Sequence, residues 1–167
     1  SARPFCIVPI RSLNTASCIG PSQESKNIPE RRWNQPDRVF FGFGACHILA
    51  GVFLEDTPRD EIYAEWIVPD DGFAGDHMFV TDGQIAFDFH GYCNRDALLV
   101  RYWKRYRSRQ PEWNATITKI DFPLLCTDEL NARQHRGPDQ YFGDPIPRAR
   151  KFIASRKCPS ANRLLLD

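Results

Sequence analysis

The sequence predicts an α+β domain in which a buried helix packs on a small, mainly antiparallel sheet. Residues 38–56 contain a dense apolar segment whose later part is apolar nearly all round, which indicates a central helix. Asp82-Gly83 separates two β-rich runs and is a strong signal for a hairpin. Residues 94–109 place apolar and aromatic side chains on one helical face and mostly charged ones on the other. Helix, strands, hairpin and helix in this order are typical of the α+β class.

Length and composition limit the kinds of protein this chain can be. It has 167 residues and a hydrophobic fraction of 42%, which suits one domain with a packed core. The formal net charge is +1, so whole-chain charge does not favour a nucleic-acid or anionic-membrane partner. No apolar run approaches the ~20 residues that span a bilayer. We therefore expect neither a nucleic acid nor a membrane as partner, and the oligomeric state stays open.

The beginning of the chain is predicted to differ from the rest. Residues 1–36 contain prolines throughout and a polar stretch at 22–27, so we expect an irregular N-terminal arm with at most a short edge strand over 5–10. A lid, a swapped arm and a packing segment are all compatible with this composition. Residues 37–167 are predicted to form the single α+β domain.

Within that domain, the apolar segment is expected to turn at Gly42 and Gly44 and then form the buried helix from Cys46 to Glu55. Acidic residues in a first helical turn and proline at a helix start indicate two short helices near the end of the chain. In chain order, the other predicted elements are a strand over 61–68, a hairpin over 77–89, a helix over 94–109, a strand over 113–121, a helix capped by Thr127 and a helix from Pro147 to about Arg156.

The cysteines do not form a recognisable scaffold or metal site. No C-x-x-C pair occurs, and the spacings are wide, so a zinc ribbon or a redox dithiol is not expected. The chain is long enough to fold without disulfides, and no apolar leader is evident. We expect reduced thiols, a cytoplasmic location, no metal and no cofactor. The six cysteines are Cys6, Cys18, Cys46, Cys93, Cys126 and Cys158.

The predicted hairpin brings a histidine and a carboxylate together. If Asp82 and Gly83 are the two loop residues, His77 faces Asp88 directly across the ladder, with Cβ atoms ~5 Å apart. A carboxylate in this position fixes the tautomer and orientation of the histidine and stabilises its imidazolium form. The pair is therefore a candidate general base with its orienting group.

Cys46 is the candidate nucleophile for this pair. It follows a glycine-rich turn and begins the buried helix, where backbone N–H groups and the helix dipole lower a thiol pKa. The same N–H groups are suited to stabilise an oxyanion. Cys46, His77 and Asp88 thus form a coherent set of nucleophile, base and orienter.

These residues resemble the papain-like thiol superfamily in its broad sense, including the NlpC/P60 and transglutaminase-like branches. The resemblance rests on Gly44-Ala45-Cys46-His47, on Gly75-Asp76-His77 with the strand after it, and on Asp82-Gly83 followed by Phe87-Asp88. It spans about residues 40–91, at most half of the chain, and is shared with uncharacterised bacterial proteins. The resemblance implies a papain-like core and a metal-free hydrolase or acyltransferase acting on amide or acyl bonds. Peptidase, amidase, deamidase and transferase outcomes remain open.

One departure from the family pattern concerns the oxyanion hole. Papain-type enzymes usually carry a glutamine about six residues before the cysteine, whereas position 40 here is phenylalanine. Asn34 and Gln35 are the nearby amides that would have to supply this donor. Otherwise backbone donors build the hole, or the site is degenerate and the chain is a non-catalytic interaction domain on the same scaffold.

Each candidate also has a purely structural interpretation. Cys46 alone is typical of core packing, and the histidine and aspartate alone are typical of structural hydrogen bonds. His47 is expected to pack or to make a hydrogen bond. His90 is expected either to contact the His77–Asp88 pair or substrate, or to lie in a surface loop. A metal site built from His47, His77, Asp88 and His90 lacks a usual ligand spacing. The basic run over 101–109 is read as the solvated face of its helix rather than as a nucleic-acid site.

Overall fold

The elements below come from a computed structural model that describes residues 28–158. The edge strand expected over 5–10 lies outside these residues. In chain order the elements are α2 (Pro29–Trp33), α3 (Asp37–Gly42), α4 (Cys46–Asp56), β1 (Tyr63–Pro69), β2 (His77–Thr81), β3 (Ile85–Asp88), β4 (Gly91–Asn94), α5 (Arg95–Arg107), β5 (Ala115–Lys119), α6 (Thr127–Asn131), the 3-10 turn η1 (Pro138–Gln140) and α7 (Pro145–Ala154).

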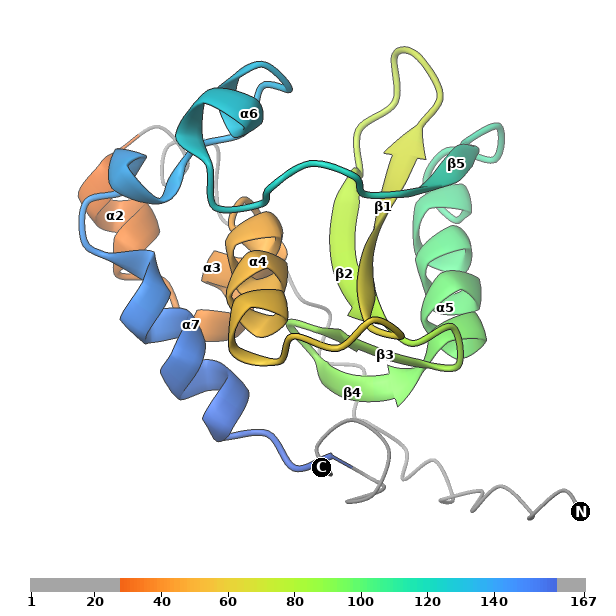
Figure 1. The fold of residues 1–167 in the computed structure, drawn as a ribbon. Coiled ribbons are helices and arrows are strands. Elements are labelled where there is room, and N and C mark those ends of the chain that lie inside the picture. The colour runs from red at the N-terminus through yellow and green to blue at the C-terminus, as the bar shows by residue number, and fades with distance from the viewer. Residues whose placement is uncertain (1–27, 159–167) are drawn as a thin grey trace, which may run out of the picture.

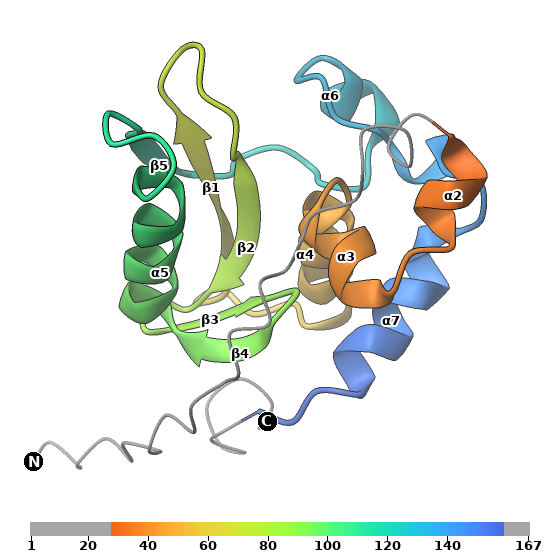
Figure 2. The same ribbon diagram turned by 180° about the vertical axis from the view of Figure 1, so that it is seen from behind.

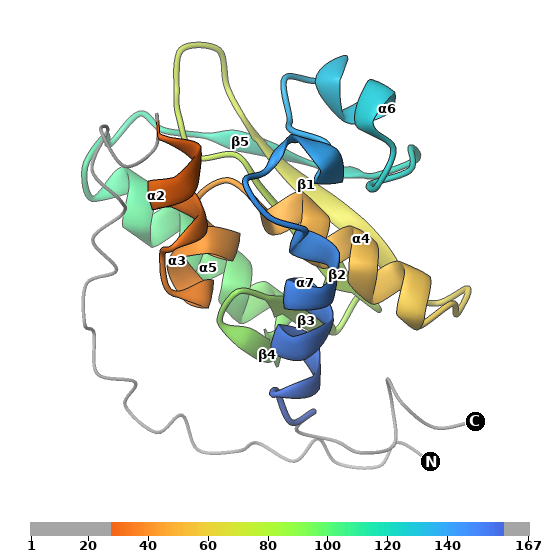
Figure 3. The same cartoon turned by 90° about the vertical axis from the view of Figure 1, so that its left-hand side faces the viewer.

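One antiparallel sheet forms the centre of the molecule, with the strand order β4-β3-β2-β1-β5. The predicted α+β class is therefore confirmed. Helices cover both faces: α4 lies on one face with α3 and α7 behind it, and α5 lies on the other (Figure 1). Figure 3 views the α7 side, where α7 packs against α4.

Successive side chains of β2 point to opposite faces of the sheet, so this strand contributes to a hydrophobic core on each face. Met78 and Val80 point toward α4, while Phe79 points toward α5 and packs there with Tyr102 and Trp113. The helix α4 has an apolar surface nearly all round and is buried from Cys46 to Phe53, as the sequence predicted. It runs along β2 from the same end of the sheet, so the first residues of α4 and β2 lie near each other (Figure 1).

The last part of the arm predicted over residues 1–36 differs from the expected irregular conformation. Residues 29–33 form α2, so this part of the expected irregular arm is helical. Figure 2 shows α2 beside α3 and α7. Arg148 of α7 holds this corner: its guanidinium donates to the carbonyls of Trp33 and Gln35 and pairs with Asp37 at 2.8 Å.

Several element limits differ from the prediction for local reasons. The segment before the glycine turn forms α3, and β4 pairs with β3 before Asn94 caps α5 through its side chain. The N-cap position of α6 is Cys126 rather than Thr127, and no side-chain hydrogen bond caps this helix. The helix α7 starts at Pro145 because the Asp144 side chain accepts a hydrogen bond from the Ile146 amide.

The described part of the chain carries free thiols at Cys46, Cys93, Cys126 and Cys158. None of the helices among residues 28–158 has the length and apolar character that crossing a membrane requires.

Candidate active site

The turn before α4 exposes the amides that begin this helix. Gly44 has a φ of +138°, a conformation that side-chain-bearing residues rarely adopt, and the Tyr141 hydroxyl donates to its carbonyl at 2.8 Å. Ala45 provides no side-chain cap, and the first intrahelical bond runs from the Leu49 amide to the Ala45 carbonyl. The N–H groups of the first turn are therefore available to a ligand. Cys46 is the first helical residue and is 8% exposed.

His77 and Asp88 meet, but not through the predicted register. Thr81 pairs with Ala86, so the ladder is displaced by two residues from the expected pairing. The reason is that Asp82 accepts hydrogen bonds from the amides of residues 84 and 85, which moves the loop to Gly83 and Gln84. A two-residue shift keeps each side chain on its original face. His77 Nε2 thus still lies 3.1 Å from Asp88 Oδ2, although the two residues are not directly opposite.

The ring of His77 is enclosed on its flat sides and edges. It stacks on Tyr102 with a centroid distance of 5.1 Å and an interplanar angle of 8°, and Phe89 contacts it edge-on. Its Nδ1 atom is buried and has no hydrogen-bond partner among the described residues. Because Nε2 is engaged by Asp88, Nδ1 is the ring nitrogen that remains for proton exchange with Cys46.

The charges of the three side chains depend on one another. Burial alone would raise the pKa of Cys46, but interactions with His47 and His77 outweigh it and lower that pKa to about 6. Burial would lower the pKa of His77, but Asp88 and Cys46 raise it to about 9. The pKa of Asp88 is held below its usual range because hydrogen bonds from His77 and His90 outweigh its burial. Near neutral pH the site therefore holds a thiolate, an imidazolium and a carboxylate.

His90 is a neighbour of Asp88 rather than of the thiol. Its backbone amide donates to Asp88 Oδ1 at 2.7 Å, and its Nδ1 lies 3.2 Å from the same oxygen. It does not line the cavity described below. Of the roles left open for His90, the structure therefore supports contact with Asp88.

The structure does not bring Asn34 and Gln35 to the thiol. Both follow α2, and the Gln35 side chain donates to the Arg31 carbonyl at 3.1 Å. Neither residue lines the cavity, and Phe40 is packed in the core. The donors that lie at the thiol are instead the backbone amides at the start of α4.

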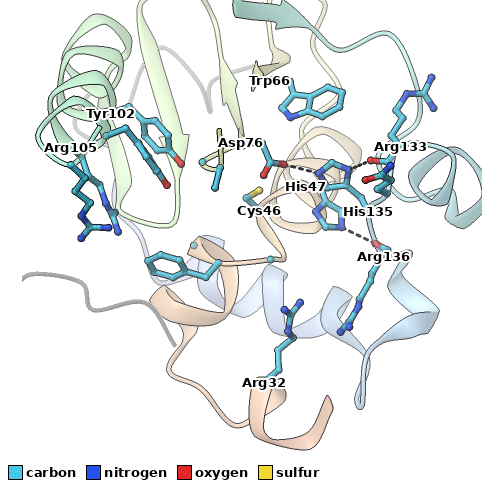
Figure 4. A pocket seen from close by; sticks show the side chains of 18 residues that line it. Arg32, Cys46, His47, Trp66, Asp76, Tyr102, Arg105, Arg133, His135 and Arg136 are labelled. Atoms are coloured by element: carbon cyan, nitrogen blue, oxygen red, sulfur yellow. Dashed lines mark hydrogen bonds and ion pairs between the residues drawn. The ribbon is translucent and has the colours of Figure 1, made fainter. Parts of the chain in front are cut away.

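A cavity of about 800 Å³ opens over Cys46 (Figure 4). Its floor is the start of α4, and its walls come from α2, the second half of α5, the segment before β2 and residues 133–136. Aromatic and cationic side chains dominate the lining. One of them is Arg105, so part of the face of α5 that was predicted to be solvated is a wall of this cavity. The charged, histidine and large aromatic lining residues are Arg32, Arg105, Arg109, Arg133, Arg136, Asp76, His47, His135, Trp66, Phe43, Tyr102 and Tyr106.

Two further histidines stand at this cavity. The sequence did not single out His135, whose Nε2 lies 3.0 Å from Asp76 Oδ2 and whose Nδ1 donates to the Arg133 carbonyl. Asp76 raises the pKa of His135 against the effect of burial. His47 makes the expected hydrogen bond, from Nε2 to the Arg136 carbonyl at 2.7 Å, but its contact with Cys46 was not predicted. No short-range signal indicates the pair of Asp76 and His135, because 59 positions separate its members.

Gly75 positions the segment that leads into His77. Its φ is +110°, and a Cβ there would overlap the Tyr106 ring. We expect Gly75→Ala to lower the free energy of unfolding by about 2–4 kcal/mol through backbone strain and overpacking. Gly72→Ala is the matched control, because Gly72 has a φ of +88° but open space around it. Urea unfolding of both variants measures the difference, and equal losses would show that contact with Tyr106 contributes nothing.

No group of three or more histidine, cysteine and acidic side chains suited to hold a metal ion occurs in the part of the chain that the structure describes. Comparison of the chain with models of protein families, with curated protein sequences and with solved structures finds no significant match. The candidate site is therefore assigned from its own geometry.

Proposed function

We propose that this protein is a cysteine-dependent hydrolase or acyltransferase that acts on amide bonds through a thioester on Cys46. The observation that carries the proposal is the buried pair of His77 and Asp88 beside the thiol at the start of α4. Asp88 engages Nε2 of the His77 ring, which leaves Nδ1 for the thiol. The resemblance to the papain-like superfamily, in its NlpC/P60- and transglutaminase-like branches, supports the same reaction class.

The first half of the reaction forms the thioester. The Cys46 thiolate attacks the amide carbonyl carbon, a sulfur–carbon bond forms, and the carbonyl π electrons move to oxygen. The backbone amides at the start of α4 donate hydrogen bonds to this oxyanion. When the tetrahedral intermediate collapses, the carbon–nitrogen bond breaks and His77 Nδ1 transfers its proton to the leaving amine.

The second half restores the enzyme. Neutral His77 takes a proton from water, and the oxygen attacks the thioester carbon, which releases a carboxylic acid and returns the thiolate. If an amine attacks instead, the product is a new amide. Asp88 stabilises the imidazolium at both stages and keeps the ring in one orientation. The proposal thus covers peptidase, amidase, deamidase and transferase outcomes.

Acylation by a small activated ester tests the proposal without knowledge of the substrate. We expect p-nitrophenyl acetate to give a burst of p-nitrophenolate and a single acetyl group on Cys46, located by peptide mass spectrometry. Cys46→Ala should abolish the burst. Cys126→Ala is the matched control, because it removes another free thiol that does not line the cavity.

The alternative function, a non-catalytic interaction domain, predicts a different outcome. The feature that favours it is Phe40, which stands where a papain-type oxyanion glutamine would be and is buried in the core. A folded protein whose Cys46 is acetylated no faster than Cys126 would contradict the enzymatic proposal and support this alternative.

A further inference from the structure

The cavity over Cys46 has a strong excess of positive charge. Five arginines line it, and Asp76 is the one carboxylate among its lining residues. That carboxylate is already engaged by His135 at 3.0 Å. The whole chain has a formal net charge of only +1, so positive charge is concentrated at the thiol rather than spread over the molecule.

Arg32 and Arg136 lie close to each other among the arginines that line the cavity. Neither makes an ion pair with any carboxylate in residues 28–158, and the buried Nε of Arg32 has no hydrogen-bond partner there. Burial lowers the pKa of Arg32, and the nearby charge of Arg136 lowers it further. Two guanidinium groups that repel each other beside a cavity are stabilised when an anion binds between them.

Several arginines away from the cavity are paired with a carboxylate. Arg95 pairs with Glu65 at 2.7 Å, Arg148 with Asp37 at 2.8 Å and Arg150 with Asp56 at 2.9 Å. Within the described range, Arg32 and Arg136 have no such carboxylate partner, and both line the cavity that contains the thiol.

The fold also holds Arg32 close to the nucleophile. Its Nη1 atom would lie 2.7 Å from a Cβ on Gly44, so the guanidinium lies against the turn that precedes Cys46. Figure 4 shows the side chains of Arg32 and Arg136 on the same side of Cys46, below His47. The uncapped start of α4 adds its own preference for negative charge at this side of the cavity.

We propose that Arg32 and Arg136 form an anion site next to Cys46, so that the amide substrate of this enzyme carries a carboxylate or phosphate group near the bond that is attacked. The inference rests on the proposed function, because it assigns a substrate class to the same site. Both anions match the planar, bidentate donor pattern of arginine.

Two alkylating agents that differ in charge test the site at the thiol itself. Iodoacetate and iodoacetamide both react by displacement of iodide from carbon by the Cys46 thiolate, but only iodoacetate is an anion. We expect the ratio of the iodoacetate rate to the iodoacetamide rate at Cys46 to exceed the ratio for N-acetylcysteine. Arg32→Gln combined with Arg136→Gln should lower that ratio by about tenfold at low ionic strength, in line with electrostatic focusing in a cleft.

The control is a double variant that has the same net charge as the Arg32/Arg136 variant but keeps both arginines of the proposed anion site. Arg38→Gln combined with Lys104→Gln removes two exposed cations that do not line the cavity, and we expect less than a twofold change in the ratio. An unchanged iodoacetamide rate in both double variants shows that each is folded with a reactive thiol. Equal ratios in the wild type and the Arg32/Arg136 variant would overturn the proposal.

The same measurements separate the two proposals from each other. An ordinary thiol pKa in the iodoacetamide profile contradicts the proposed function, whereas the rate ratio reports the anion site whether or not the thiol is activated. Protection of Cys46 by inorganic phosphate and by glutarate then identifies the group that the site takes. Stronger protection by phosphate assigns a phosphorylated amide, and stronger protection by glutarate assigns a carboxylate.

Discussion

Replacement of His77 by glutamine is expected to slow acetylation of Cys46 at pH 7 by about 10²-fold or more, because the thiol loses its proton acceptor. The pKa of Cys46 is about 6 in the presence of His77. Without the imidazolium, only His47 still opposes the effect of burial, and we expect that pKa to rise toward the ordinary value, about 8.5. Glutamine retains an N–H group for Asp88, so the carboxylate is not left without a donor.

The pH dependence of iodoacetamide alkylation measures this effect directly. The wild-type rate should rise with an apparent pKa near 6, and the His77→Gln profile should move to higher pH. His90→Gln is the matched control, since His90 contacts Asp88 but does not line the cavity. We expect less than a threefold change in its rate at pH 7, which is small on the scale of general-base effects. A wild-type profile centred near 8.5 would contradict an activated thiol.

Removal of the buried carboxylate should cost more stability than removal of any exposed one. Asp88 and His77 are each 1% exposed, and Asp88→Ala leaves the imidazolium without its ion-pair partner. We expect the free energy of unfolding to fall by about 3–5 kcal/mol, the usual cost of breaking a buried pair. Asp37→Ala is the matched control: it breaks the exposed pair with Arg148 and should cost about 1 kcal/mol or less. Urea unfolding at pH 7 measures both.

The acid dependence of stability gives a second readout of Asp88. Its pKa in the folded protein is below the unfolded value, so the unfolded chain binds the proton more readily. The stability it contributes is therefore present above about pH 4 and is lost as the pH falls toward the folded pKa. In Asp88→Ala, the free energy of unfolding should therefore fall less steeply as the pH decreases below about 4. An unchanged pH dependence would show that the loss of stability in acid arises from other carboxylates.

Local sequence patterns were sufficient for much of the fold. The all-round apolar character of residues 46–53 predicted a buried helix, and the alternation around Asp82-Gly83 predicted which side chains share a face. The exact register was not predictable, because it depends on side-chain hydrogen bonds of Asp82 rather than on the alternation. The helix α2 was missed because Arg148, more than a hundred residues away, holds the end of this proline-flanked segment.

The sequence by itself determined the parts of the site that depend on short-range order: a thiol at the start of a buried helix, and a histidine and an aspartate on one face of a hairpin. Only the tertiary structure decided what surrounds them. His135 reaches Asp76, and Arg32 and Arg136 converge on Cys46 from opposite ends of the described chain. Periodicity reports which face of an element is buried, but the partner on that face is set by packing between distant segments. For that reason the reaction class could be proposed from the sequence, and the charge of the substrate only from the structure.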